Sequence, residues 1–190
     1  MKMTRISPLS LFVSMLLFVV LPREAVVSAV LSMLCHEAAH AIMGRMFNMR
    51  IHGITILPLG ISIEMTPAPS YISELLVALS GPIMNGVICA FAYHLGQMEL
   101  FFTSMALGAL NLMPICPLDG GAALRAAACL AFGERTADII VNLCGMAALS
   151  FLYICAIYVL FYSTENFALI AFVSYMFVLF CIKRDKSFKS

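Results

Sequence analysis

The sequence predicts an all-α polytopic membrane protein with about six transmembrane helices and a short interfacial β-hairpin after the second helix. Of the 190 residues, 63% are hydrophobic and only 11% are charged, whereas about 25% charged is normal for a soluble domain. The apolar residues form five or six runs, each close to the roughly 20 residues that a helix needs to cross a bilayer. The net charge of +1 gives no indication of a nucleic-acid partner, and we expect none.

The first helix has two interpretations. An apolar run over residues 9–21 follows two basic residues and precedes a small-residue stretch that ends at Ala29, a pattern that also fits a secretory signal peptide. Cleavage after Ala29 would cut into the second predicted helix, which covers about residues 24–47. We therefore expect an uncleaved first transmembrane helix that extends back to Ser7.

Residues 50–65 predict a β-hairpin. Isoleucine-rich segments there are interrupted by two glycines and a proline, which is typical of short strands joined by a turn. Two interpretations remain open: a plain interfacial loop, or a sheet edge that pairs with an extended peptide. Ser70 or Ser73 is the expected cap of the next helix.

Four apolar segments predict the remaining long helices. They cover about residues 71–95, 99–113, 136–162 and 167–182, and a shorter helix is expected over residues 122–132. Pro82 lacks a backbone donor, so we expect it to kink or break its helix. Asn85 places an amide one turn later, either beside a functional site or as an ordinary hydrogen-bonding residue between helices.

His36-Glu37-Ala38-Ala39-His40 is the chemical motif of the chain. H-E-x-x-H on a helix puts both imidazoles on one face, where they can bind one metal ion while the glutamate acts on water. A carboxylate at membrane depth costs about 2.5–3.5 kcal/mol on insertion scales and usually faces a cavity. Asp119 is the expected third ligand, because it lies in a stretch whose two prolines and two glycines predict irregular backbone around a cavity.

The placement of charge predicts the orientation. If the N-terminus is cytoplasmic, the outer side carries only Arg23 among the basic residues. The cytoplasmic side then carries Lys2, Arg5, Arg45, Arg50, Arg125, Arg135, Lys183, Arg184, Lys186 and Lys189. This asymmetry agrees with the positive-inside rule. It predicts that both termini and the active-site motifs face the cytoplasm.

Seven cysteines are scattered through the apolar runs. Their number is odd and no C-x-x-C pair occurs, so the sequence predicts neither a disulfide framework nor a thiolate zinc site. Cys116 lies close to Asp119 in the sequence, and a thiolate there could compete as a ligand. We favour two histidines and a carboxylate, because that set with an open fourth position already fits catalytic zinc.

The order of three motifs resembles the site-2 protease family of intramembrane metalloproteases. The motifs are the helix-borne H-E-x-x-H, then G-P-x-x-N at residues 81–85, then N-x-x-P-x-x-P-L-D-G-G at residues 111–121. The small bacterial branch typified by stage IV sporulation protein FB is the most similar, and the resemblance covers a catalytic core of about residues 24–131. It implies one Zn²⁺ per chain, held by His36, His40 and Asp119, with Glu37 activating water. It also implies a set of substrate-binding residues, namely Asn85, Asn111, Pro114 and Pro117.

The resemblance implies regulated intramembrane proteolysis. The expected activity is that of a zinc-dependent endopeptidase that cleaves a transmembrane or membrane-associated protein within or next to its transmembrane segment, with sigma-factor activation in sporulation as the role typical of the branch. The expected location is the bacterial cell membrane. Many relatives carry a PDZ or a CBS domain, whereas residues 1–190 are expected to form a single domain without either. Control would then come from an inhibitory membrane-protein partner or from substrate supply.

Two other function classes compete with this interpretation. A non-catalytic membrane scaffold with a structural metal site needs no glutamate beside its first histidine, so Glu37 separates it from an enzyme. A metal transporter is disfavoured, because the last two predicted helices offer only Asp138 near one end. The sequence predicts neither the substrate nor the oligomeric state.

Overall fold

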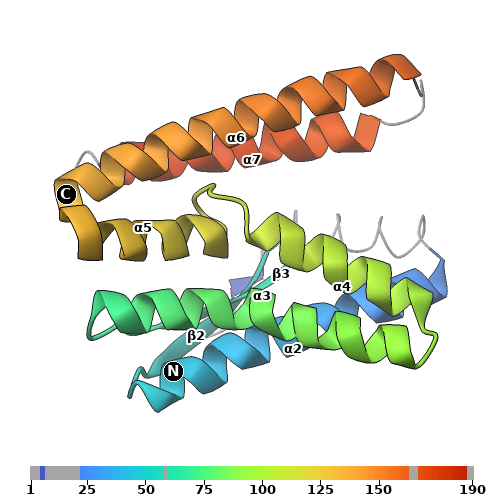
Figure 1. Ribbon diagram of the computed structural model, residues 1–190, viewed down its shortest axis with the longest axis horizontal. Coiled ribbons are helices and arrows are strands. Elements are labelled where there is room, and N and C mark those ends of the chain that lie inside the picture. The colour runs from blue at the N-terminus through green and yellow to red at the C-terminus, as the bar shows by residue number, and fades with distance from the viewer. Residues whose placement is uncertain (1–4, 7–21, 58–59, 163–166, 188–190) are drawn as a thin grey trace. The chain divides into compact units, whose positions relative to one another are not determined.

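The computed structural model describes residues 5–6, 22–57, 60–162 and 167–187, and this part of the chain is mainly helical (Figure 1). Its helices are α2 (Arg23–Met46), α3 (Tyr71–His94), α4 (Met98–Asn111), α5 (Asp119–Phe132), α6 (Glu134–Tyr162) and α7 (Phe167–Ser187). Its strands are β1 (Arg5–Ile6), β2 (Ile51–Leu57) and β3 (Gly60–Met65). The helix predicted over residues 7–21, and with it the question of a signal peptide, lies outside the described residues.

The chain divides into two compact units, Met1–Asn111 and Leu112–Ser190. The first unit contains α2, α3, α4 and the sheet, and the second contains α5, α6 and α7. The prediction of one domain over residues 1–190 stays a prediction.

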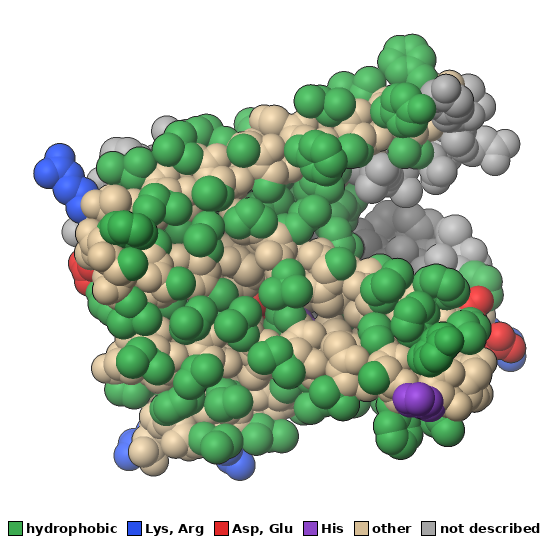
Figure 2. All heavy atoms as spheres, viewed as in Figure 1, with side chains coloured by type: hydrophobic (Ala, Val, Ile, Leu, Met, Phe, Trp, Pro, Cys, Tyr) green, Lys and Arg blue, Asp and Glu red, His purple; other side chains and the backbone are tan. Residues whose placement is uncertain are grey.

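The described helices have the surface of a membrane protein. Three of them, α2, α3 and α6, are long and apolar enough to cross a membrane, and α7 contains the shorter apolar stretch Ile170–Cys181. With 14 residues each, α4 and α5 are only about 21 Å long, less than the hydrocarbon thickness of about 30 Å. Figure 2 shows hydrophobic side chains spread across the visible face between backbone and other side chains, with few charged side chains. The membrane prediction is confirmed, while the number of six spans stays a prediction.

The two faces of α2 have opposite character. Large apolar side chains such as Val27 (65% exposed) and Ile42 (61% exposed) point outward. The buried residues of this helix are small or polar: Ser32, His36, Ala39, His40 and Gly44. Four of these five follow one another at intervals of four residues, which places them on one face. This helix therefore presents its apolar face to the membrane and its polar face to the protein.

A matching stripe lies on α3, which packs against both α2 and α4. Its buried residues at intervals of four are Ser73, Val77, Gly81 and Asn85. Small residues at such an interface let two helices approach closely. Pro82 is buried inside this helix, which continues to His94. Pro82 therefore does not break the helix, and the predicted alternative, a kink, stays a prediction.

The first turn of α3 confirms the predicted cap. Ser70 accepts a hydrogen bond from the Ser73 backbone N–H, and the Ser73 hydroxyl accepts one from the Ser70 backbone N–H. This reciprocal pair satisfies two donors that the start of a helix leaves without partners. Both candidate cap residues therefore take part in one capping box.

The predicted hairpin is also confirmed. Strands β2 and β3 pair in antiparallel fashion, with an irregularity in register between Ile51 and Gly53. Strand β1 pairs in parallel with the other edge of β2, so among the described strands the outer edge of β3 has no strand beside it. Gly44 lets α2 approach this hairpin, because a Cβ on it would lie 2.6 Å from the Met65 sulfur.

The second unit has a conventional apolar core. Ile115, Leu149, Met176 and Phe180 are each at most 3% exposed and form one cluster. The helices α6 and α7 lie side by side in this unit (Figure 1). On α6, Gly145 makes room for the aromatic ring of Phe180, which would lie 2.8 Å from a Cβ at that position.

Helix α5 begins earlier than predicted. The expected start was near Ala122, but Asp119 is the first residue of the helix and Gly120 and Gly121 are part of it. A Cβ on Gly120 would lie 2.2 Å from the Leu112 carbonyl oxygen, so only glycine lets the helix fold back this closely onto the preceding loop. The end of α7 also differs, at Ser187 in place of the predicted residue 182.

Candidate metal centre

His36 and His40 form a facing pair on the buried side of α2. They are 3% and 8% exposed, and their Nε2 atoms are 3.1 Å apart. The ring centroids are 4.7 Å apart with the ring planes at 81°, so the two rings meet edge to face. The one-turn spacing of H-E-x-x-H thus brings two nitrogen ligands to one point, as the sequence predicts.

The other ring nitrogens of both histidines contact α3. His40 Nδ1 lies 2.7 Å from the Val77 carbonyl oxygen and 3.2 Å from the Ser80 hydroxyl. His36 Nδ1 lies 3.0 Å from the Asn85 amide nitrogen. Metal-binding histidines usually have their second nitrogen held in this way, which sets the ring orientation. One helix therefore supplies the ligands and the next helix orients them.

Gly81 keeps the space in front of both Nε2 atoms open. A Cβ at this position would lie 2.4 Å from His40 Nε2 and 2.6 Å from His36 Nε2. Such distances are far below van der Waals contact. A glycine is therefore required where α3 passes the two imidazoles.

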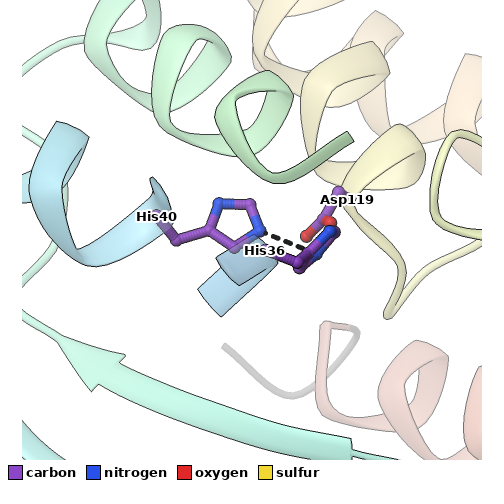
Figure 3. A group of neighbouring side chains, drawn as sticks. All are labelled: His36, His40 and Asp119. Carbon is purple, nitrogen blue, oxygen red and sulfur yellow. Dashed lines mark hydrogen bonds between the residues drawn. The ribbon is translucent and has the colours of Figure 1, made fainter. Parts of the chain in front are cut away.

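Asp119 belongs to the same group of candidate ligands. Figure 3 shows it with the two histidines, and the three ligand atoms that these residues offer all lie within 4.8 Å of one another. Cys116 is not among the members of this group.

The donor set and its spacing fit zinc. Two Zn–N bonds of about 2.0–2.1 Å at a tetrahedral angle place the two nitrogens about 3.3 Å apart, close to the observed 3.1 Å. Two imidazoles and one carboxylate leave a fourth position open, as in catalytic zinc sites.

Comparison with known proteins yields relatives for about half of the chain. No family model matches it. A zinc metalloprotease of Methanocaldococcus jannaschii is 29% identical over 107 residues, which are 50% of this chain and 31% of the relative. Stage IV sporulation protein FB of Bacillus subtilis is 30% identical over 109 residues, which are 52% of this chain and 38% of the relative. The chain thus covers less than two fifths of either relative's length.

Among solved structures, a site-2 protease from Methanocaldococcus jannaschii is similar with a TM-score of 0.68 and 22% sequence identity. The similarity covers 90% of this chain and 83% of that one. The chain has the site-2 protease fold. The fold that this resemblance implies is thereby confirmed.

Within this site-2 protease fold, the remaining predicted site residues differ in their surroundings. Glu37 is half-buried next to the first histidine. Asn111 is the last residue of α4, and Pro114 and Pro117 lie in the loop before α5, with Pro117 exposed. Their substrate-binding role stays a prediction. The substrate-binding role of Asn85 also stays a prediction; this side chain is 1% exposed and lies 3.0 Å from His36 Nδ1.

The sequence interpretation missed three features around the histidines in this site-2 protease fold. Two are groups that contact His40, the Val77 carbonyl and the Ser80 hydroxyl. The third is the absence of a side chain at Gly81. A signal was available, because small and polar residues recur every four positions on both helices. Aligning the two stripes in antiparallel fashion would have placed Gly81 and Asn85 opposite the histidines.

Proposed function

We propose that this chain is an intramembrane zinc metalloprotease, an endopeptidase that cleaves a membrane-associated protein within or next to its transmembrane segment. The observation that carries the proposal is the pair of facing Nε2 atoms, 3.1 Å apart, on a helix long and apolar enough to cross a membrane. The name of one relative, a zinc metalloprotease, and the shared fold support the same assignment.

Each residue of the motif has a distinct task in this proposal. His36, His40 and Asp119 would hold one Zn²⁺ per chain. When bound, zinc supplies Lewis acidity, which lowers the pKa of water toward about 7 and polarises a peptide carbonyl. Glu37 accepts the proton of the attacking water and passes it to the nitrogen of the scissile bond as that bond breaks.

The substrate must expose a peptide bond before it can react. A transmembrane helix hides its carbonyls in its own hydrogen bonds, so it has to unwind near the site. The edge of β3 that is open among the described strands could replace the lost bonds by pairing with the unwound segment. We propose that Asn111, Pro114 and Pro117 position the same segment.

The proposed setting is a multi-pass protein of the bacterial cell membrane. It includes six transmembrane helices, with both termini and the metal site toward the cytoplasm, as the distribution of basic residues predicts. The substrate would be a membrane-associated signalling precursor, and an inhibitory membrane protein would control its cleavage. The name of one relative, a sporulation protein, supports a sporulation sigma factor as one such precursor.

The test uses the full chain in detergent with a membrane-associated substrate. We expect Glu37→Gln to lower the cleavage rate by about 10²–10⁴-fold, the usual contribution of a general base, without loss of zinc measured by mass spectrometry. Glu99→Gln is the matched control, because this carboxylate is exposed in the first turn of α4. Cleavage by Glu37→Gln at the wild-type rate would contradict the proposal. Retained biological activity in that variant, with zinc bound, would support the scaffold alternative.

A further inference from the structure

The loop between α4 and α5, residues 112–118, leads directly into Asp119, the proposed third zinc ligand and the first residue of α5. Hydrogen bonds continue from this loop into the helix. The Leu118 backbone N–H donates to the Ile115 carbonyl at 2.7 Å, and the Leu118 carbonyl accepts from the Ala122 N–H at 3.2 Å. Asp119 thus lies within consecutive hydrogen-bonded turns, so the position of the loop sets the position of its backbone.

Glycines bring two helices against the main chain of this loop. On α5, a Cβ at Gly121 would lie 2.7 Å from the Ile115 carbonyl carbon, which is closer than such atoms approach, so only glycine fits there. On α6, a Cβ at Gly145 would lie 3.3 Å from the Pro114 carbonyl oxygen, a tight contact. The backbone of the loop is therefore held against α5 and α6, and all of these residues belong to the second unit.

Ile115 attaches the same loop to the apolar core of the second unit. Its side chain is 0% exposed, and it belongs to the cluster of buried residues in that core. The other buried members of the cluster come from α6 and α7: Leu149, Met176 and Phe180. Met113 and Leu118 of the loop pack against the cluster from partly buried positions. The loop is thus held by its side chains as well as by its backbone.

We propose that Ile115 is a positioning residue for the zinc site, because it fixes the loop that sets the place of Asp119. A ligand has to be held within about 0.5 Å of its productive position, and a carboxylate at the start of a helix moves with the backbone before it. The helices α6 and α7 thereby take part in metal binding without supplying a ligand. This inference rests on the proposed zinc site and deepens it.

The competing interpretation is that Ile115 contributes only to the stability of the core. Leu149 provides the comparison, because it has the same number of side-chain carbons, is 2% exposed and belongs to the same cluster. It lies within the continuous helix α6, and not in the loop that leads to Asp119. A stability role predicts the same behaviour for both truncations, whereas a positioning role predicts a change at the metal site only for Ile115→Ala.

The test compares Ile115→Ala with Leu149→Ala in the full chain in detergent. Both truncations remove buried apolar volume, so both should lower the midpoint of unfolding by denaturing detergent to a similar extent. Zinc affinity, measured by competition with a chromogenic chelator, should fall by about 10–100-fold in Ile115→Ala, the usual effect of losing a group that orients a ligand. It should stay at the wild-type value in Leu149→Ala. Ile115→Val keeps most of the anchoring side chain and should restore most of the affinity.

Cobalt(II) in place of zinc gives a readout of the ligand set itself. Its visible absorption depends on the number and geometry of the ligands, and Asp119→Ala provides the reference spectrum of a site without the carboxylate. Ile115→Ala should change the spectrum toward this reference, whereas Leu149→Ala should keep the wild-type spectrum. A residue that only stabilises the core would leave the spectrum of the folded molecules unchanged.

Amide hydrogen exchange of the wild-type chain tests the inference without any variant. If Ile115 and not the metal fixes the loop, the Leu118 N–H, which donates to the Ile115 carbonyl, should be equally protected from exchange with and without zinc. Protection that arises only with zinc would show that the metal orders the loop, and would overturn the inference.

Two further outcomes would overturn it. Wild-type zinc affinity and an unchanged cobalt spectrum in Ile115→Ala would refute the positioning role, and an equal loss of affinity in Leu149→Ala would assign the effect to the core as a whole. A wild-type chain that binds neither metal ion would refute the proposed function itself, whereas metal binding that is unaffected by Ile115→Ala refutes this inference alone.

Discussion

The buried stripes of α2 and α3 and the core of the second unit are two different solutions to packing in a membrane protein. On α2 and α3, the buried residues include serines, glycines, two histidines and an asparagine, and the buried apolar residues among them are no larger than valine or proline. In the second unit, Ile115, Leu149, Met176 and Phe180 form a cluster of large apolar side chains. The first interface depends on hydrogen bonds and close backbone approach, and the second depends on filled volume.

This difference shows where the chain buries polar groups, which lowers stability unless each is hydrogen-bonded, in order to build a metal site. Buried polar groups contribute stability only when each has a partner, and each partner on α3 is placed for one atom of a histidine. An apolar cluster tolerates changes of similar volume. Substitutions between α2 and α3 should therefore affect metal binding first, and those in the second unit should affect folding first.

The largest effect is expected for Gly81→Ala. The added methyl group would lie 2.4 Å from His40 Nε2 and 2.6 Å from His36 Nε2, so the imidazoles or the helix must move. Because misplacing ligands by about 1 Å can cost on the order of 10²-fold in activity, we expect at least that loss in zinc affinity and cleavage. Chelator competition and a cleavage assay measure both.

Gly86→Ala is the matched control for that substitution. Gly86 lies on the same helix, and a Cβ there meets nothing within 4 Å. Alanine also has a higher helix propensity than glycine by about 1 kcal/mol, so zinc affinity should stay at the wild-type value. An equal loss in both variants would mean that the general properties of the helix, and not the space at Gly81, determine metal binding.

An intermediate effect, on stability and not on metal binding, is expected for Phe180→Ala. Phe180 is 3% exposed in the apolar cluster, and its truncation should cost about 3–5 kcal/mol in the free energy of unfolding. Unfolding by denaturing detergent measures this loss, and the zinc content of the molecules that stay folded should be unchanged. Phe177→Ala is the control, since Phe177 is 49% exposed on the same helix. A similar loss of stability in both variants would remove the distinction between core and surface.

The smallest effect is expected for the ion pair of Arg125 and Asp138. Its Nε–Oδ1 distance is 3.0 Å, but the two side chains are 35% and 41% exposed. Exposed pairs of this kind usually contribute about 0.2–1 kcal/mol, and salt should reduce the value further. A double-mutant cycle with Arg125→Ala and Asp138→Ala gives the coupling energy. A value well above that range would show that this pair, and not the apolar cluster alone, stabilises the second unit.

Much of the fold follows from the apolar runs and their interruptions. The second helix was predicted at residues 24–47 and lies at Arg23–Met46, since Pro22 precedes the apolar run and the polar residues Asn48 and Arg50 follow it. The start of α5 was predicted three residues late, because two glycines count against a helix by propensity. Their close contact with residues 112–115 overrides that preference.

The part of the candidate site that could be predicted is mainly the part formed by consecutive residues of one helix. His36, Glu37 and His40 form a local motif, and the place of Asp119 in a proline-broken stretch indicated a third ligand. The role of Asn85 was not readable in this way, because it depends on the register of α3 against α2. Gly81 was part of the G-P-x-x-N motif, but the motif did not indicate the space that this glycine leaves beside two imidazoles.

The Val77 carbonyl has a consequence for how mutations would report on this site. His40 is oriented by a main-chain oxygen, which every amino acid supplies, so a saturation scan at position 77 would register only changes in packing. His36 depends on a side chain that one nucleotide change can remove. A mutational scan would therefore detect the group that orients His36 and miss the group that orients His40, although both histidines are equally important as ligands.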